Sequence, residues 1–274
     1  MWSRPCLLLC IVLACSSRVN AGTLHDKARA GDISFFDDNT EVFEEDDEAK
    51  AELNAREEGS GQTPLMAASL AGKHLIVDKL MRLRADPTIT EKDGYTPPHG
   101  VAFQGRAEAA RALIKHDVAI DVAHSDGFTP LHRTVWGGTP QHMLTAKILV
   151  KEGGADVNHR DHEGFTPAHR ALVSGWMEMV KTLLELGAKP NIKNREFGET
   201  MLHTAVKNQD AKVVKLLLEF GGDITVKNKK GESPLDMATR VHSAEVKTLM
   251  ERASVKRRRE IFGAGDADEK KDEL

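Results

Sequence analysis

Histidines and carboxylates are the residues of this chain whose types and spacing could do chemistry. His159 and His162 stand three residues apart in the stretch NHRDHEG, and two such imidazoles could share a zinc ion. A closed tetrahedral site needs four ligands, however, and this pair offers too few. We therefore predict no metal site here.

Residues 37–58 hold eleven acidic residues against two basic ones. Clustered carboxylates attract hard cations such as calcium, or a basic peptide. The segment lacks the spaced ligands and turn glycine of a calcium-binding loop, so we interpret it as a solvated, partly disordered insertion. A protein that buffers calcium or senses cations through residues 37–58 remains the alternative function.

No catalytic set is present in the sequence. It has no glycine-rich phosphate loop, no Gly-x-Ser-x-Gly and no His-Glu-x-x-His. We therefore predict neither an enzyme nor a bound cofactor. The net charge of −4 gives no reason to expect nucleic-acid binding.

The two ends of the chain predict its compartment. Residues 1–21 combine a positive charge at Arg4, an apolar run from Cys6 to Cys15 and a small residue at Ala21, as in a cleaved secretory signal. This leader holds all three cysteines, and no later apolar stretch is long enough to cross a membrane. The chain ends in Lys-Asp-Glu-Leu, the signal by which a receptor retrieves proteins to the endoplasmic reticulum. We thus expect a resident of the reticulum lumen that engages this receptor through Lys271, Asp272, Glu273 and Leu274.

The elements that must position any site come from a repeated segment. GQTPLMAASLAG begins at Gly61, and related segments begin at Gly94, Gly127, Gly164, Gly198 and Gly231, at spacings of 33, 33, 37, 34 and 33 residues. Glycine tolerates the positive φ of a tight turn, threonine can cap a helix, and proline suits the first helical turn. A second helix with leucines at three- and four-residue intervals follows, and we expect Leu216 and Leu217 to pack in the core.

These segments resemble the ankyrin repeat family, whose hallmark is Gly-x-Thr-Pro-Leu-His-x-Ala in units of about 33 residues. The resemblance implies an all-α solenoid of stacked helix-turn-helix units with short β-hairpin-like fingers. It also implies a structural hydrogen-bonding role for His99, His132, His169 and His203. The four extra residues of the third unit, around TPQHML, should bulge outward from the turn between its helices. The predicted divisions are a signal peptide (1–21), a degenerate N-terminal capping repeat with the acidic insertion (22–60), six ankyrin repeats (61–252) and a basic-then-acidic tail (253–274).

Function in this family is recognition, so the resemblance implies a scaffold or adaptor that binds a luminal protein on its concave surface. An accessory subunit of a luminal enzyme complex is a further alternative, and we expect a monomer. Partners of ankyrin arrays contact the finger tips and the exposed edge of the first helices. For the aromatic residues that follow the turn glycines, packing against the neighbouring finger is an alternative to partner contact. The predicted contact positions hold Tyr95, Phe103, Gln104, Phe128, Trp136, Phe165, Val173, Ser174 and Lys207, with Glu199 and Asn208 in the fifth unit.

Two basic groups lie toward the C-terminal end of the chain. Lys229, Lys230 and Arg240 extend the charge of Lys207, and we expect them to affect association rate more than affinity. Lys256–Arg259 reads KRRR, which resembles a nuclear localisation signal. We expect it instead to complement the carbonyl end of the last helix.

Overall fold

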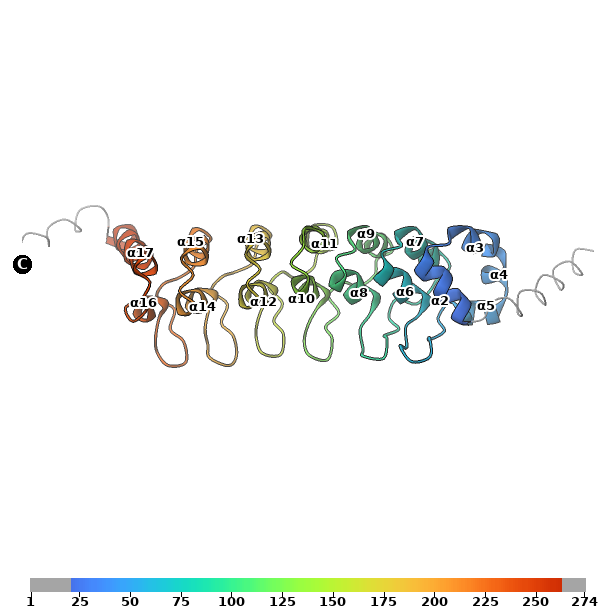
Figure 1. Ribbon diagram of the computed structural model, residues 1–274, viewed down its shortest axis with the longest axis horizontal. Helices are drawn as coiled ribbons and strands as arrows, with labels where there is room; N and C mark the ends of the chain where they lie inside the picture. Colours follow the sequence, from blue (N-terminus) through green and yellow to red (C-terminus); the bar gives the residue numbers. More distant parts are fainter. Residues whose placement is uncertain (1–20, 263–274) are drawn as a thin grey trace, which may run out of the picture. The chain divides into compact units, whose positions relative to one another are not determined.

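The computed structural model describes residues 21–262, and every regular element in this range is a helix (Figure 1). The predicted all-α fold is therefore confirmed. The chain divides after Asp156 into two compact units. None of the described helices is long and apolar enough to cross a membrane.

In the first unit, each repeat opens with a short helix that begins at a proline. These helices are α6 (Pro64–Ala71), α8 (Pro97–Phe103) and α10 (Pro130–Arg133). The preceding threonine caps each one, as when Thr63 Oγ1 accepts a hydrogen bond from the Met66 N–H at 3.2 Å. This cap satisfies a backbone donor that has no partner within the helix. The threonine-proline pair thus sets where each first helix starts.

The second helices of this unit are α7 (His74–Arg82), α9 (Ala107–Lys115) and α11 (Pro140–Lys151). Their apolar faces are buried; in α7, Ile76, Val77 and Leu80 are almost fully buried. Helix α7 packs on α9 and α9 on α11, while α6 packs on α8 and α8 on α10. Neighbouring repeats therefore bury each other's apolar faces in a continuous core.

Histidines in the repeat signature join successive repeats. His99 Nε2 donates to the carbonyl of Phe128 at 3.2 Å, and its Nδ1 lies 2.8 Å from Thr96 Oγ1. Burial lowers the pKa of His99 to about 4, so the ring is neutral at pH 7. His25 occupies the same place in α2 (Ala21–Ala30), where its Nε2 donates to the carbonyl of Gln62 at 2.8 Å. The structural role predicted for His99 and His203 is therefore confirmed, the latter by its Nε2 lying 3.1 Å from the carbonyl oxygen of Glu232. His25, which the prediction did not include, has the same role.

The acidic segment differs from the prediction of partial disorder. Residues 33–52 form three short helices, α3 (Ile33–Asp38), α4 (Thr40–Glu45) and α5 (Asp47–Glu52). Phe36 and Phe43 are buried, with ring centroids 6.3 Å apart, and Leu53 is also buried. Sequence reasoning counted the charges and overlooked these apolar residues, whose burial opposes the entropy of a disordered chain.

The third repeat also differs from the prediction of an outward bulge. Its first helix is short and continues as a 3₁₀ turn, η1 (Thr134–Trp136). The extra residues then begin α11, where Thr139 and His142 form a second threonine-histidine cap with Oγ1 and Nδ1 2.7 Å apart. His142 Nε2 donates to the carbonyl of Phe103 at 2.9 Å. The insertion therefore lengthens the second helix and ties it to the preceding repeat.

The second unit continues the pattern with α12 (Pro167–Val173), α13 (Met177–Glu185), α14 (Met201–Lys207), α15 (Ala211–Glu219), α16 (Pro234–Ala238) and α17 (Ala244–Phe262). Helix α14 begins at methionine where other repeats have proline, and Thr200 still provides its capping box. Leu217 is fully buried, but Leu216 is only half-buried, so the expectation for Leu216 was wrong. The two residues are 100° apart on the helix, and only one can face the centre of the core.

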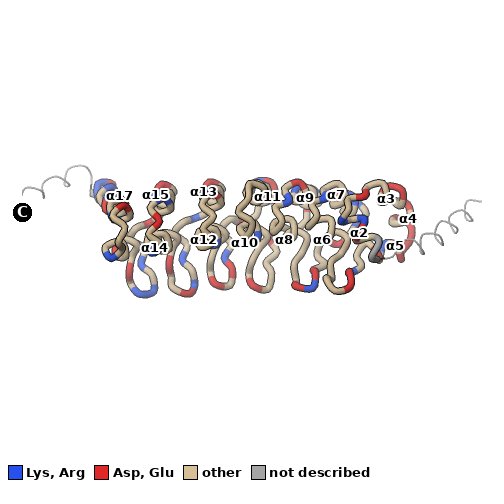
Figure 2. The backbone as a smooth tube through the Cα atoms, in the orientation of Figure 1, with Lys and Arg blue, Asp and Glu red and all other residues tan. Residues whose placement is uncertain are grey.

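Between repeats, the chain makes extended fingers. None of the described residues forms a β-strand, but each finger closes with hairpin-like hydrogen bonds, such as Glu91 N–H to the Tyr95 carbonyl at 2.9 Å. Charged residues gather toward the finger turns (Figure 2). The finger turns are therefore rich in charge.

Candidate protein-binding surface

An exposed aromatic pair marks the candidate surface in the first unit. Phe103 ends α8 and Trp136 ends η1, and their side chains are 43% and 56% exposed. Their ring centroids lie 6.0 Å apart. They meet because they occupy matching positions in successive stacked repeats. Large exposed aromatic side chains in contact form an apolar patch of the kind that partners cover.

Beside this pair is a hollow of about 310 Å³. Met66 and Leu70 come from α6, Gly100 and Phe103 from α8, and Arg133 and Trp136 from the third repeat. Gly100 and Arg133 are each the seventh residue of their repeat. A Cβ added at Gly100 would lie 3.2 Å from the side chains of both Met66 and Leu70. The missing side chain at Gly100 thus helps keep the hollow open.

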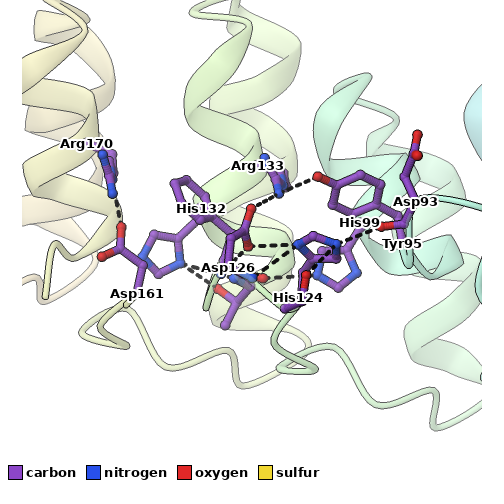
Figure 3. A network of polar contacts seen from close by, with 12 residues as sticks. Asp93, Tyr95, His99, His124, Asp126, His132, Arg133, Asp161 and Arg170 are labelled. Carbon is purple, nitrogen blue, oxygen red and sulfur yellow. Dashed lines mark hydrogen bonds and ion pairs between the residues drawn. The ribbon is translucent and has the colours of Figure 1, made fainter. Parts of the chain in front are cut away.

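Arg133 forms one wall of the hollow and is only 5% exposed. Its guanidinium carbon lies 4.6 Å from the ring centroids of Tyr95 and Phe128, and 5.1 Å from that of Trp136. Nη2 donates to Tyr95 Oη at 2.7 Å and to Asp126 Oδ2 at 2.6 Å (Figure 3). The three rings and the carboxylate together offset the cost of burying this cation.

Asp126 is held ionised beside Arg133. Burial alone would raise the pKa of this carboxyl, but hydrogen bonds from the Phe128 N–H and His124 and the charge of Arg133 lower it to about 2. His124 Nδ1 lies 2.9 Å from Asp126 Oδ1, and its ring stacks on Tyr95 at 4.2 Å. Tyr95 and Phe128 are half-buried in this network. They support the surface rather than project from it.

Glu91 lies at the finger side of the hollow and is half-buried. Its carboxylate accepts a long hydrogen bond from Gln62 Nε2 at 3.4 Å. Burial raises the pKa of this carboxyl, and the negative charge of Asp93 raises it further. Within residues 21–262, no cation pairs with Glu91. The hollow therefore carries a carboxylate without a counter-charge.

In the second unit, the predicted contact residues lie at or beside the ends of α12 and α14. The guanidinium carbon of Arg170 lies 4.6 Å from the ring centroid of Phe165, and Arg170 Nε donates to the buried Asp161 at 2.7 Å. As at Arg133, an arginine is thus held by a ring and a carboxylate, but the carboxylate comes from a different position of the repeat. Val173 is 57% exposed at the end of α12. Gln104 of the first unit and Ser174, Lys207 and Asn208 of the second are also exposed, and Glu199 is half-buried.

Sequence reasoning missed several residues of both units. In the first unit these are Met66, Leu70, Glu91, Gly100 and Arg133 of the hollow. A signal was available, because the seventh residue varies between repeats, as alanine, glycine, arginine, arginine, threonine and methionine in order. In the second unit, sequence reasoning missed the exposed Trp176 and Phe197, the latter 5.7 Å beneath the amino group of Lys207.

Among residues 21–262, no group of three or more histidine, cysteine, aspartate or glutamate side chains could hold a metal ion. This range includes the acidic segment and the pair His159 and His162. The predicted retrieval signal, Lys271 to Leu274, and residues 1–20 of the predicted signal peptide lie outside the described residues.

Family models of ankyrin repeats match residues 65–161 and 140–194, and a further ankyrin model matches residues 193–238. NF-kappa-B inhibitor zeta of Bos taurus is 28% identical over 154 residues, which is 55% of this chain and 20% of the relative. NF-kappa-B inhibitor delta of Mus musculus is 29% identical over 156 residues, covering 57% of this chain and 43% of the relative. The chain thus spans less than half the length of these relatives.

Solved structures show the same fold. The ankyrin repeat domain of Bcl-3, a member of the IkappaB protein family, aligns with a TM-score of 0.73 and 24% identity, covering 83% of this chain and 97% of that chain. The human ASB11 ankyrin repeat domain aligns with a TM-score of 0.64 and 23% identity, covering 84% and 96%.

Proposed function

Because the chain belongs to the ankyrin-repeat family, we propose that it is a non-enzymatic scaffold that binds another protein in the lumen of the endoplasmic reticulum. The observation that carries the binding role is the exposed pair Phe103 and Trp136 beside the hollow. Rigid aromatic side chains bury a large area with few rotatable bonds, so residues of this kind dominate interface energies.

The luminal location is supported by the sequence of the two ends. Residues 1–21 have the pattern of a secretory signal, and the chain closes with the retrieval tetrapeptide from Lys271 to Leu274. A luminal protein is separated by a membrane from a nuclear factor. The role named for the NF-kappa-B inhibitors therefore does not fit the proposed location.

Protease protection of microsomes tests the location. The protein should resist added protease until detergent opens the vesicles, and its N-terminus should lie near Gly22. Deleting Lys271 to Leu274 should move it into the medium, whereas an equally long deletion of residues 263–266 should not. A protease-sensitive chain that retains Met1 would contradict the luminal proposal.

Proximity labelling from inside the lumen, followed by purification of the labelled partner, tests the binding surface. Trp136→Ala should weaken binding of that partner about thirtyfold or more, the equivalent of about 2 kcal/mol. Leu75→Ala is the control, because Leu75 is also an exposed large apolar residue, 59% against 56%, and lies on α7, which carries none of the predicted contact positions. Equal affinity of both variants and the parent chain, with equal circular dichroism, would place the interface elsewhere.

Calcium buffering through residues 37–58 is the competing function. Deleting the segment would remove the buried Phe43 and Leu53, so charge-neutralising substitutions are the better test. Glu44, Glu45, Asp47 and Glu48 can be replaced by glutamine or asparagine. The variant should bind the protein partner as the parent does. Calorimetric calcium binding by the parent that the variant loses would favour the competing function.

A further inference from the structure

The charge of the hollow in the first unit points to the chemistry of its occupant. The charge of Arg133 is compensated, because Nη2 lies 2.6 Å from the Asp126 carboxylate and three aromatic rings lie around the guanidinium. Its buried Nε has no hydrogen-bond partner among the described residues. Glu91 has no such compensation, since it receives only the long hydrogen bond from Gln62. The hollow therefore carries one uncompensated negative charge, that of Glu91.

The rest of the hollow is suited to an alkyl chain. Met66, Leu70 and Gly100 present apolar atoms, and the exposed rings of Phe103 and Trp136 stand beside them. Lysine and arginine side chains lay their methylene groups along apolar surface and keep the charge at the end. A ring face within about 6 Å also attracts a cation. A volume of about 310 Å³ is at the lower end of the range for ligand pockets and fits a single large side chain.

An acidic side chain fits this site poorly. It would face Glu91 without a counter-charge, and Arg133 is 5% exposed behind its aromatic neighbours. A purely apolar side chain would fill the hollow but would bury the carboxylate of Glu91 further, which costs free energy when no hydrogen bond or cation replaces water.

We propose that the hollow receives an arginine or lysine side chain from an extended segment of the protein partner. Its alkyl part lies on Met66, Leu70 and Gly100, beside Phe103 and Trp136, and its cation pairs with Glu91. This assignment rests on the proposed scaffold function and adds the chemistry of the residue that is recognised. Pairing in a partly desolvated site gives specificity, because a neutral residue leaves Glu91 unpaired.

Selection from a phage-displayed library of random nonapeptides tests the assignment on the full chain. Parallel selections use the parent, Glu91→Gln and Glu58→Gln, the last an exposed carboxylate on the preceding finger. We expect the parent and Glu58→Gln to enrich arginine or lysine at one position. Glu91→Gln should lose that enrichment while its circular dichroism stays unchanged.

Synthetic forms of an enriched peptide then separate charge from shape by fluorescence polarisation. Replacing its arginine by the neutral isostere citrulline, or its lysine by norleucine, should weaken binding to the parent at least tenfold. The same replacement should change binding to Glu91→Gln less than threefold, because the pairing is already absent.

Two other outcomes would overturn the assignment, and they differ in whether the proposed binding surface survives. Peptides with an apolar or acidic residue at the selected position, insensitive to Glu91→Gln but lost with Trp136→Ala, refute the basic occupant and leave the scaffold function standing. Selected peptides that bind Glu91→Gln and Trp136→Ala as tightly as the parent refute both this occupant and the proposed surface.

Discussion

Gly137 provides a sharp test of how the third repeat holds the surface. It follows Trp136, and its φ of −96° is one that alanine readily adopts. A Cβ at this position, however, would overlap the imidazole of His142. In Gly137→Ala the ring must leave, and its interactions with Thr139 Oγ1 at 2.7 Å and with the Phe103 carbonyl at 2.9 Å are lost.

The expected cost follows from these two hydrogen bonds and the buried ring. Each bond contributes about 1 kcal/mol, and His142 is 8% exposed, so Gly137→Ala should lower the free energy of unfolding by about 2–4 kcal/mol. His142→Ala should cost a similar amount. Adding Gly137→Ala to His142→Ala should then cost less than about 0.5 kcal/mol, because the clash is gone and alanine reduces the entropy of the unfolded chain.

Urea unfolding followed by circular dichroism measures the free energy of unfolding of the parent, the two single variants and the double variant. The coupling between the two positions should be about 2–4 kcal/mol in favour of the double variant. Additive costs would refute the clash with His142 as the cause. A harmless Gly137→Ala would mean that His142 does not tie α11 to the preceding repeat.

Three further predictions concern stability. Leu217→Ala should cost about 2–5 kcal/mol and Leu216→Ala clearly less, because only Leu217 is fully buried; urea midpoints that reverse this order would contradict the packing. Phe36→Ala should cost about 3–5 kcal/mol, whereas a change within error would indicate that α3 does not pack. His99 and His169 have pKa values of about 4 because burial disfavours their charged form, so each stays neutral while the unfolded chain takes up a proton below pH 6.5. Stability should therefore fall from pH 7 to pH 5, by about 2 kcal/mol for each histidine, and replacing either by glutamine should flatten the profile.

The sequence was sufficient for the fold because one local pattern recurs in phase. Thr63 and its counterparts cap the first helices, a proline begins each of them except α14, and histidines such as His99 bridge to the next finger. Prediction from the sequence failed where the chain departs from this pattern. Around His142, a second capping motif extends a helix where an insertion predicts a loop. Near Phe43, a few apolar residues within a highly charged segment are enough to fold it.

The candidate surface was only half predictable, for a related reason. Exposure of Phe103 and Trp136 follows from their position in the repeat, so sequence reasoning placed them correctly. The hollow depends on three repeats at once: apolar side chains of the first, a missing side chain at Gly100 in the second, and the aromatic cover over Arg133 in the third. Such a cavity is a property of neighbours in space, and no single repeat contains its pattern.

The residues of the repeat signature cannot by themselves distinguish partners. Their side chains cap helices, form hydrogen bonds between repeats or pack in the core. Discrimination must come from positions that differ between repeats and reach the surface. The seventh residue is such a position: glycine at 100 opens space, while arginine at 133 fills space and orders Tyr95 by a hydrogen bond of 2.7 Å. We therefore expect local variation on a stable frame to set the partner specificity of this chain, since one fold can serve unrelated partners.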